Sequence, residues 1–211
     1  MIYLLITTSI LNKHGLQQQT ERQRRYEYAI TETLRHVPAD IQPILVENNG
    51  QRATYLDHFQ HQGKPVPVVY TDNNKFTQYK SKGVNEMLDI KEVIERQGIK
   101  SDDILIKLTG RYRILSPLFF QEVVANQDKY DAFVKFFGTC SLQWERYDCI
   151  LGCYGIRARY LQLFQPITID NSASAEIAFA RYVRFCGARL REVSQLDLEC
   201  QFAEDNRILV V

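Results

Sequence analysis

Residues 102–113 read Asp-Asp-Ile-Leu-Ile-Lys-Leu-Thr-Gly-Arg-Tyr-Arg, and the interpretation of the whole chain starts from this stretch. The apolar run 104–106 predicts a buried strand, because isoleucine and leucine suit a pleated, buried surface. A turn that carries cations around Gly110 follows at once. In open α/β sheets, ligands bind beyond the carboxyl ends of the strands, and a cationic turn with a glycine suits a phosphate there. The alternative is a solvated loop with ordinary surface arginines.

The composition is that of a globular chain of 211 residues, 45% hydrophobic, which can build one sizeable core or at most two small ones. The formal net charge of +1 gives no long-range attraction to nucleic acid, so nucleic acid is not expected as a partner. No run approaches the roughly 18 apolar residues of a membrane helix, and the short apolar start does not resemble a signal peptide. We therefore expect a soluble, cytoplasmic protein without a membrane span.

The five cysteines are an odd number in a chain too long to depend on disulfides. Cys149 and Cys153 have the spacing C-x3-C, without a second pair or a neighbouring histidine cluster, which is a poor zinc signature. We expect unpaired, mostly buried thiols.

Hydrophobic periodicity predicts strands that alternate with helices through about residue 125. Strands are expected at residues 1–6, 41–46, 66–70, in the opening stretch, and at 130–137, 148–154, 190–198 and 208–211. Helices are expected at 17–36, 52–61, 83–97, 116–125, 156–164 and 173–185, the last capped by Ser172 or Ser174. The alternation predicts a mostly parallel sheet with helices on both faces, and the less regular later strands predict a partly mixed one. No linker or repeat divides the chain, so residues 1–211 are expected to form a single domain.

Polar residues stand at the carboxyl ends of several predicted strands. They are Thr7-Thr8-Ser9, Glu47-Asn48-Asn49, Thr71-Asp72-Asn73 and the segment from Lys107 through Thr109 and Gly110 to Arg111. Parallel strands would bring these ends to one edge of the sheet, which favours a nucleotide or another phosphorylated ligand. Neither G-x-G-x-x-G nor G-x-x-x-x-G-K-[ST] occurs, which disfavours a dinucleotide fold and a P-loop.

Cations also stand near the expected starts of two helices. Lys82 and Gly83 open the helix at 83–97, and the amino end of a helix favours phosphate. Arg22 and Arg25, early in the helix at 17–36, can reach back toward Thr7.

The order of these motifs resembles that of the small GT-A-fold glycosyltransferase-like proteins of large DNA viruses and some bacteria. The motifs are Thr7-Thr8-Ser9, Arg22 and Arg25, Val46-Glu47-Asn48-Asn49, Lys82-Gly83-Val84-Asn85-Glu86, and the segments 106–112 and 148–152. The similarity covers most of the chain. The Lys-x-Thr-Gly-Arg-Tyr and Lys-Gly-x-x-Glu blocks are moderately specific together and weak apart.

The resemblance implies a GT-A-like (Rossmann-like) fold and transfer of a sugar from a nucleotide sugar, first of all a UDP-sugar. The acceptor would be a glycan, a glycoprotein or another hydroxyl compound, and the reaction would be cytoplasmic, in the host if the protein is viral. Residues 1–115 would bind the donor and 116–211 would form the acceptor side. The expected nucleoside contacts are Thr7, Thr8, Ser9, Glu47, Asn48 and Asp72. The expected diphosphate contacts are Lys82, Lys107, Thr109, Gly110 and Arg111.

The chain departs from the GT-A pattern at the place where an Asp-x-Asp motif usually holds a divalent metal. That place reads Thr109-Gly110-Arg111, so a cation can meet the diphosphate directly and metal dependence (Mn²⁺ or Mg²⁺) stays open. Asp72, Asp102 and Asp103 are the remaining metal-ligand candidates, although the last two precede their strand and belong to its far end.

Sugar transfer commonly needs a carboxylate that takes the proton of the acceptor hydroxyl. Glu176, in the first turn of a predicted helix, is our candidate, and Asp148 is the second choice. The alternative for Glu176 is a structural one, because the helix dipole favours an acidic residue in a first turn. Two other functions stay open: a sugar-phosphate nucleotidyltransferase, which would be expected to carry a glycine-rich loop after the first strand, and a non-catalytic nucleotide-binding or scaffold domain.

Overall fold

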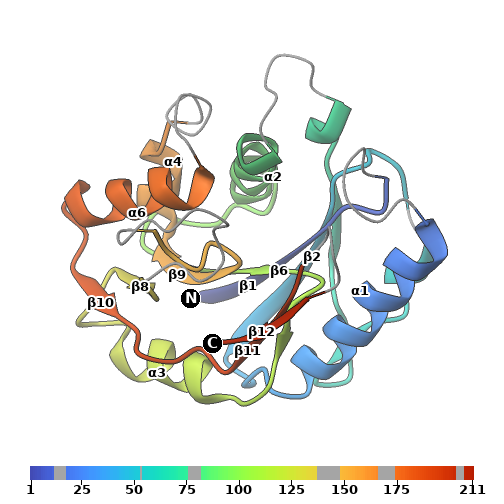
Figure 1. Ribbon diagram of the computed structural model, residues 1–211, viewed down its shortest axis with the longest axis horizontal. Coiled ribbons are helices and arrows are strands. Elements are labelled where there is room, and N and C mark those ends of the chain that lie inside the picture. Colours follow the sequence, from blue (N-terminus) through green and yellow to red (C-terminus); the bar gives the residue numbers. More distant parts are fainter. Residues whose placement is uncertain (12–17, 53, 76–81, 137–147, 166–173, 203–206) are drawn as a thin grey trace.

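The computed structural model describes residues 1–11, 18–52, 54–75, 82–136, 148–165, 174–202 and 207–211. Its main sheet contains β1 (Ile2–Thr8), β2 (Ile41–Glu47), β5 (Val68–Tyr70), β6 (Ile104–Thr109), β8 (Ala132–Val134), β9 (Cys153–Arg157) and β10 (Leu190–Glu192). The spatial order is β10-β8-β9-β6-β1-β2-β5, shown in Figure 1. Only β9 runs antiparallel to its neighbours within this sheet. The expected mostly parallel, partly mixed sheet is confirmed.

Helices cover both faces of the sheet, as Figure 1 shows. They are α1 (Gln19–Leu34) and α3 (Leu118–Asn126) on one face, and α2 (Lys82–Arg96), α4 (Ala158–Leu163) and α6 (Ala175–Phe185) on the other. Successive side chains of a strand point to opposite faces, so Leu4 packs under the first layer while Leu5 packs under the second. Burial on both faces explains why β1 and β6 are continuous apolar runs rather than alternating ones.

A small second sheet joins the end of the chain to the stretch that follows β6. It consists of β7 (Arg113–Ile114), β11 (Leu198–Gln201) and β12 (Ile208–Val210), in the order β12-β11-β7, all antiparallel. An ion pair of 2.8 Å between Arg113 and Glu199 adds to this pairing. The C-terminal strands thereby pair with the segment that directly follows the basic turn.

Most of the expected helices are confirmed within a few residues. α1, α2, α3 and α6 lie where periodicity predicted them, and Ser174 caps α6 by accepting a hydrogen bond of 3.1 Å from the amide of Ile177. The alternative cap, Ser172, lies outside the described residues.

Three expectations about secondary structure were wrong. The helix expected at 52–61 is a short 3-10 turn, η1 (Thr54–Leu56), followed by a hairpin of β3 (Gln60–His61) and β4 (Lys64–Pro65). The strand expected at 148–154 starts only at Cys153 and runs through Arg157, because it pairs with β6 as far as Ile104. The strand expected at 190–198 is divided between β10 and β11, which belong to different sheets. In each case the strand's pairing partner determines where the strand begins and ends, and the local sequence does not reveal that partner.

The described cysteines form no disulfide with one another, and most of them are buried. Within the described part of the chain, every helix is too short or too polar to cross a bilayer.

Candidate functional site

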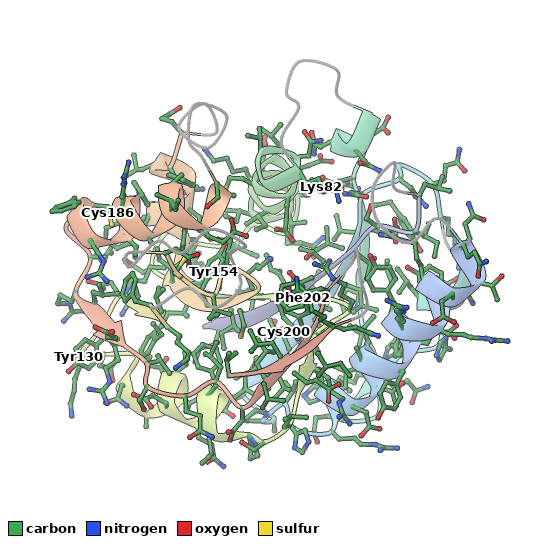
Figure 2. All side chains as sticks on the ribbon, viewed as in Figure 1. Lys82, Tyr130, Tyr154, Cys186, Cys200 and Phe202 are labelled. Atoms are coloured by element: carbon green, nitrogen blue, oxygen red, sulfur yellow. The ribbon has the colours of Figure 1, made fainter. Side chains whose placement is uncertain are left out.

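A cleft of about 250 Å³ lies at the carboxyl ends of β1 and β6, between the first turns of α2 and α6. The predicted site residues that line it are Thr7, Thr8, Ser9, Asn48, Lys82, Lys107, Thr109, Arg111 and Glu176. Lys82, labelled in Figure 2, lies in the first turn of α2. The parallel register that places Thr7 beside Thr109 explains why distant stretches of sequence meet here.

Lys107 lies inside the wall of the cleft rather than on its surface. Its side chain is 2% exposed, and its ammonium donates to Thr109 Oγ1 at 2.7 Å and to the carbonyl oxygen of Leu151 at 3.1 Å. It also pairs with Glu86 Oε1 at 2.9 Å. An ammonium has three protons, so these oxygens satisfy all of them. The expectation of a direct diphosphate contact therefore does not match the geometry of Lys107.

Glu86, on α2, forms the ion pair with the Lys107 ammonium and also lines the cleft. Its Oε1 also accepts a hydrogen bond of 2.6 Å from the hydroxyl of Thr7. Burial alone would raise the pKa of Glu86, but the charge of Lys107 and the hydrogen bonds from Thr7 and Lys107 hold that pKa below its usual value. Glu86 is thus a carboxylate kept ionised by a lysine of the neighbouring strand.

The turn after β6 depends on Gly110. A Cβ atom at this position would lie 2.8 Å from both the carbonyl oxygen of Thr7 and Cγ2 of Thr8, and the Gly110 amide donates to that carbonyl oxygen at 2.8 Å. Gly110 does not line the cleft, so its part in the site is the close approach of two backbones.

Arg111, the next residue, does line the cleft. Its Nε donates to the carbonyl oxygen of Gln201 at 2.8 Å, and its guanidinium stacks on the ring of Tyr112 with 4.9 Å to the centroid. Among the described residues, no hydrogen bond engages its two terminal nitrogens. Those nitrogens are the fork that binds carboxylate or phosphate in pairs.

Glu47 is fully buried and does not line the cleft, contrary to the expectation that it contacts the nucleoside. Its carboxylate accepts hydrogen bonds from Thr8 Oγ1 at 2.8 Å, Tyr55 Oη at 2.9 Å and the Ile10 amide at 3.0 Å. Burial raises the pKa of Glu47, and these hydrogen bonds oppose the rise. Through its hydrogen bond from the Ile10 amide, Glu47 fixes the segment that follows β1.

Arg22 holds the same segment from the side of α1, as its position in the sequence suggested. Its Nε and Nη2 donate to the carbonyl oxygen of Ser9 at 3.1 and 2.6 Å, and Nη2 also donates to the hydroxyl of Tyr26 at 3.1 Å. Arg22 and Tyr26 both line the cleft, so they shape its wall beside Ser9.

Several predicted acidic residues lie elsewhere. Asp148 is fully buried and Asp72 is exposed, and neither lines the cleft. Asp102 and Asp103 lie at the opposite end of β6, as expected, where Asp103 binds the amino group of Met1 at 2.7 Å. These four residues are therefore not part of the cleft that the structure describes.

Glu176 lies in the first turn of α6 and lines the same cleft as the strand ends. Within the described part of the chain its carboxylate accepts no hydrogen bond and joins no ion pair, whereas its backbone carbonyl oxygen accepts a hydrogen bond from Cys149 Sγ at 3.5 Å. An ionised carboxylate in this position is able to accept a proton from a bound hydroxyl group.

Two acidic residues of the cleft were missed as site residues, Glu86 and Asp89, which lie three positions apart on α2 and so share one face. Asp89 is 2% exposed and accepts a hydrogen bond of 2.9 Å from Asn73. Burial raises the pKa of Asp89 to about 7. The signal was present in the sequence, because Asp89 falls between the apolar residues Met87 and Ile90 of this helix, which are both buried.

The cleft does not fit the metal site that GT-A proteins usually carry. Thr109, Gly110 and Arg111 supply no carboxylate after β6, Glu86 is bound to Lys107, and Asp89 is bound to Asn73. Across the described residues, no group of three or more histidine, cysteine, aspartate or glutamate side chains can hold a metal ion.

The sequence matches no protein-family model and no curated protein. Solved structures do match. One is the putative nucleotide-diphospho-sugar transferase from Desulfovibrio desulfuricans G20, with a TM-score of 0.56, 10% identity, and coverage of 91% of this chain and 79% of that one. The galactosyltransferase LgtC has a TM-score of 0.58 and 8% identity over 92% of this chain and 73% of its own.

The bifunctional IspDF from Campylobacter jejuni is also similar, with a TM-score of 0.50 and 12% identity over 91% of this chain. This chain spans about half of that protein, 49% of its length. At such low identities the likeness establishes the fold alone. The chain has a GT-A-like fold, with a mostly parallel central sheet flanked by helices.

Proposed function

We propose that this protein transfers a sugar from a nucleotide-sugar donor, preferably a UDP-sugar, to a hydroxyl group of a glycan or glycoprotein. One observation carries the proposal. In a GT-A-like sheet, the cations Lys82 and Arg111 and the carboxylate Glu176 line one cleft at the carboxyl ends of parallel strands. Cations suit a diphosphate, and a carboxylate facing them suits an acceptor.

On this proposal the nucleoside lies over the ends of β1 and β2. Ser9 and Asn48 line the cleft there, and the side-chain oxygen of Asn48 accepts no hydrogen bond from the described residues. That oxygen is buried, so a nucleoside would meet this wall through Ser9 and the exposed part of Asn48. Thr7 and Thr8 serve the site indirectly, because their hydroxyls already donate to Glu86 and to Glu47.

The diphosphate would lie between Arg111 and Lys82. The guanidinium is already oriented by Gln201 and by the ring of Tyr112, so little side-chain entropy is lost when phosphate binds. Lys82 stands in the first turn of α2, where the partial positive charge of the helix adds to its own.

The acceptor would enter from the side of α6. Leu151, Gly152, Ala175 and Glu176 line that wall, and all belong to the second half of the chain. This supports a division in which residues 1–115 hold the donor and 116–211 form the acceptor side. Glu176 would take the proton of the acceptor hydroxyl as its oxygen attacks the donor sugar and nucleoside diphosphate leaves.

A thermal-shift screen of nucleoside diphosphates and nucleotide sugars tests the proposal. A ligand that binds only the folded protein raises its melting temperature by mass action, so UDP and at least one UDP-sugar should do so. If no nucleoside diphosphate shifts the melting temperature at millimolar concentration, the proposal is wrong. Release of UDP from the bound donor, measured with and without glycan acceptors, then separates a transferase from a binding domain. Release of pyrophosphate from a nucleoside triphosphate would instead indicate a nucleotidyltransferase.

A further inference from the structure

The ammonium of Lys107 is surrounded by oxygen atoms in the manner of a bound cation. A carboxylate oxygen of Glu86, the hydroxyl of Thr109 and the carbonyl of Leu151 lie 2.9, 2.7 and 3.1 Å from it. Carboxylate, hydroxyl and backbone carbonyl oxygens are the donor types that hard cations such as Mg²⁺ and Ca²⁺ use in proteins. Here a covalently attached cation from β6 already occupies the centre of such a set.

The position of Lys107 in the chain also bears on metal binding. Lys107 precedes by two residues the turn at Thr109, Gly110 and Arg111, where GT-A proteins usually present metal-binding carboxylates. Glu86, the carboxylate that reaches Lys107 among the described residues, comes from α2 and accepts a hydrogen bond from Thr7 as well. A divalent ion at this point would have to share Glu86 with an ammonium that lies 2.9 Å away, and like charges at such a distance repel strongly.

Without a divalent ion, the negative charge of a donor diphosphate can be balanced by cationic side chains that line the same cleft. Arg111 lines it with its terminal nitrogens unengaged by the described residues, and Lys82 lines it from the first turn of α2. Together the two cations can offset the charge that a divalent ion would otherwise balance.

We propose that Lys107 is a built-in cation that replaces the divalent metal, so that the cleft binds nucleoside diphosphate without metal through Arg111 and Lys82. This inference rests on the proposed function, and it assigns Lys107 a positioning role. The lysine neutralises Glu86 and thereby keeps the cleft attractive to a diphosphate, although it does not touch that ligand.

Calorimetric titration of UDP into the full chain, in EDTA and then in millimolar Mn²⁺, tests the inference. We expect dissociation constants that agree within about twofold in the two buffers. Binding that tightens about tenfold or more in Mn²⁺, or that occurs only there, overturns this inference and leaves the proposed function standing. Absence of binding in both buffers overturns the proposed function, and this inference with it.

The variant Lys107→Ala tests the role of the lysine itself. Its removal leaves Glu86, Thr109 and the Leu151 carbonyl around a gap, so UDP should bind about tenfold more weakly in EDTA and should recover in Mn²⁺. The double variant Lys107→Met/Glu86→Gln replaces the pair by neutral groups of similar size and should fold. Because it leaves no uncompensated carboxylate, it should bind UDP in EDTA more tightly than Lys107→Ala does, and Mn²⁺ should not change its affinity. If Lys107→Ala binds UDP as tightly as the wild type in EDTA, Lys107 is merely structural and the inference is wrong. If Lys107→Ala does not fold, the double variant decides, because UDP binding about tenfold weaker than wild type in EDTA, or binding that tightens in Mn²⁺, would contradict the inference.

Discussion

The two ends of strand β6 are both rich in charge, yet they differ in how that charge is satisfied. At the amino end, Asp103 binds the amino group of Met1, and Asp102 pairs with Arg159. Close by, the buried carboxylate of Asp131 accepts hydrogen bonds of 2.7 Å from Arg157 and 3.0 Å from Arg189. These charges serve the fold, because their partners belong to the same chain.

At the carboxyl end, Lys107 and Glu86 also form an ion pair with each other. Two other charged groups of the same cleft keep atoms without such a partner. The terminal nitrogens of Arg111 and the carboxylate of Glu176 make no hydrogen bond to the described residues. Charged residues thus stand at both ends, and among the described residues these two groups at the carboxyl end lack a partner and line a cleft. Satisfaction of charge, rather than its amount, therefore distinguishes the candidate binding site from the structural ion-pair cluster.

The largest effect is expected at the amino end, from Asp131→Asn. The substitution leaves Arg157 and Arg189 without their shared carboxylate. Breaking a buried ion pair lowers the free energy of unfolding by several kcal/mol, and we expect about 3 kcal/mol here because the arginines are partly exposed. Urea unfolding measures the loss, and UDP affinity of the folded variant should not change. A loss below about 1 kcal/mol would show that the cluster is not structural.

At the carboxyl end, Glu176→Gln should lower turnover about a hundredfold or more in a transfer assay, because the amide cannot accept the proton. Folding and UDP affinity should stay near wild type. Glu21→Gln is the matched control, since Glu21 is also an acidic residue in a helix's first turn but lies outside the cleft. Nearly intact turnover in Glu176→Gln would remove Glu176 from the mechanism.

Arg111→Ala should weaken UDP binding about ten- to a hundredfold, the effect of losing one charge-assisted contact of about 1.5–3 kcal/mol. Arg159→Ala, at the other end of β6, removes the same type of side chain and should leave the affinity unchanged. Calorimetric titration of both variants measures the difference. Equal affinities in the two variants would show that Arg111 is structural and that the two ends do not differ as described.

A dependence of stability on pH is expected from Asp89. With burial raising its pKa to about 7, the folded protein keeps this proton at pH values where the unfolded chain, with a pKa of about 4, has lost it. The stability contributed by the protonated carboxyl is complete below about pH 4 and is lost as pH rises to about 7. Relative to Asp89→Asn, the free energy of unfolding of the wild type should therefore fall by up to about 1.4 kcal/mol for each pH unit between pH 5 and 7. Chemical unfolding at several pH values measures this slope, and a flat difference would contradict the raised pKa.

The sequence was informative where parallel pairing decides the outcome. Thr7 and Thr109 could be placed together because parallel strands align their carboxyl ends, and Gly110 could be singled out because it stands in that turn. The antiparallel strand β9 and the division of β10 from β11 could not be foreseen, since hydrophobic periodicity does not reveal strand direction or partner.

Individual roles within the site were harder to predict than its location. Lys107 and Glu47 were expected to touch the ligand, yet both bind residues distant in sequence, Glu86 for Lys107 and Thr8 for Glu47. A sequence shows that a charge stands at a strand end, but whether that charge meets a ligand depends on the helix packed above it. Glu86 and Asp89 were missed for the same reason.

A crystal structure of the protein grown with saturating UDP would locate the nucleotide directly. We expect the diphosphate within hydrogen-bond distance of the Arg111 guanidinium, in the cleft between the first turns of α2 and α6, with the nucleoside over the ends of β1 and β2. UDP bound on another surface, or a cleft that stays empty at saturating UDP, would contradict it.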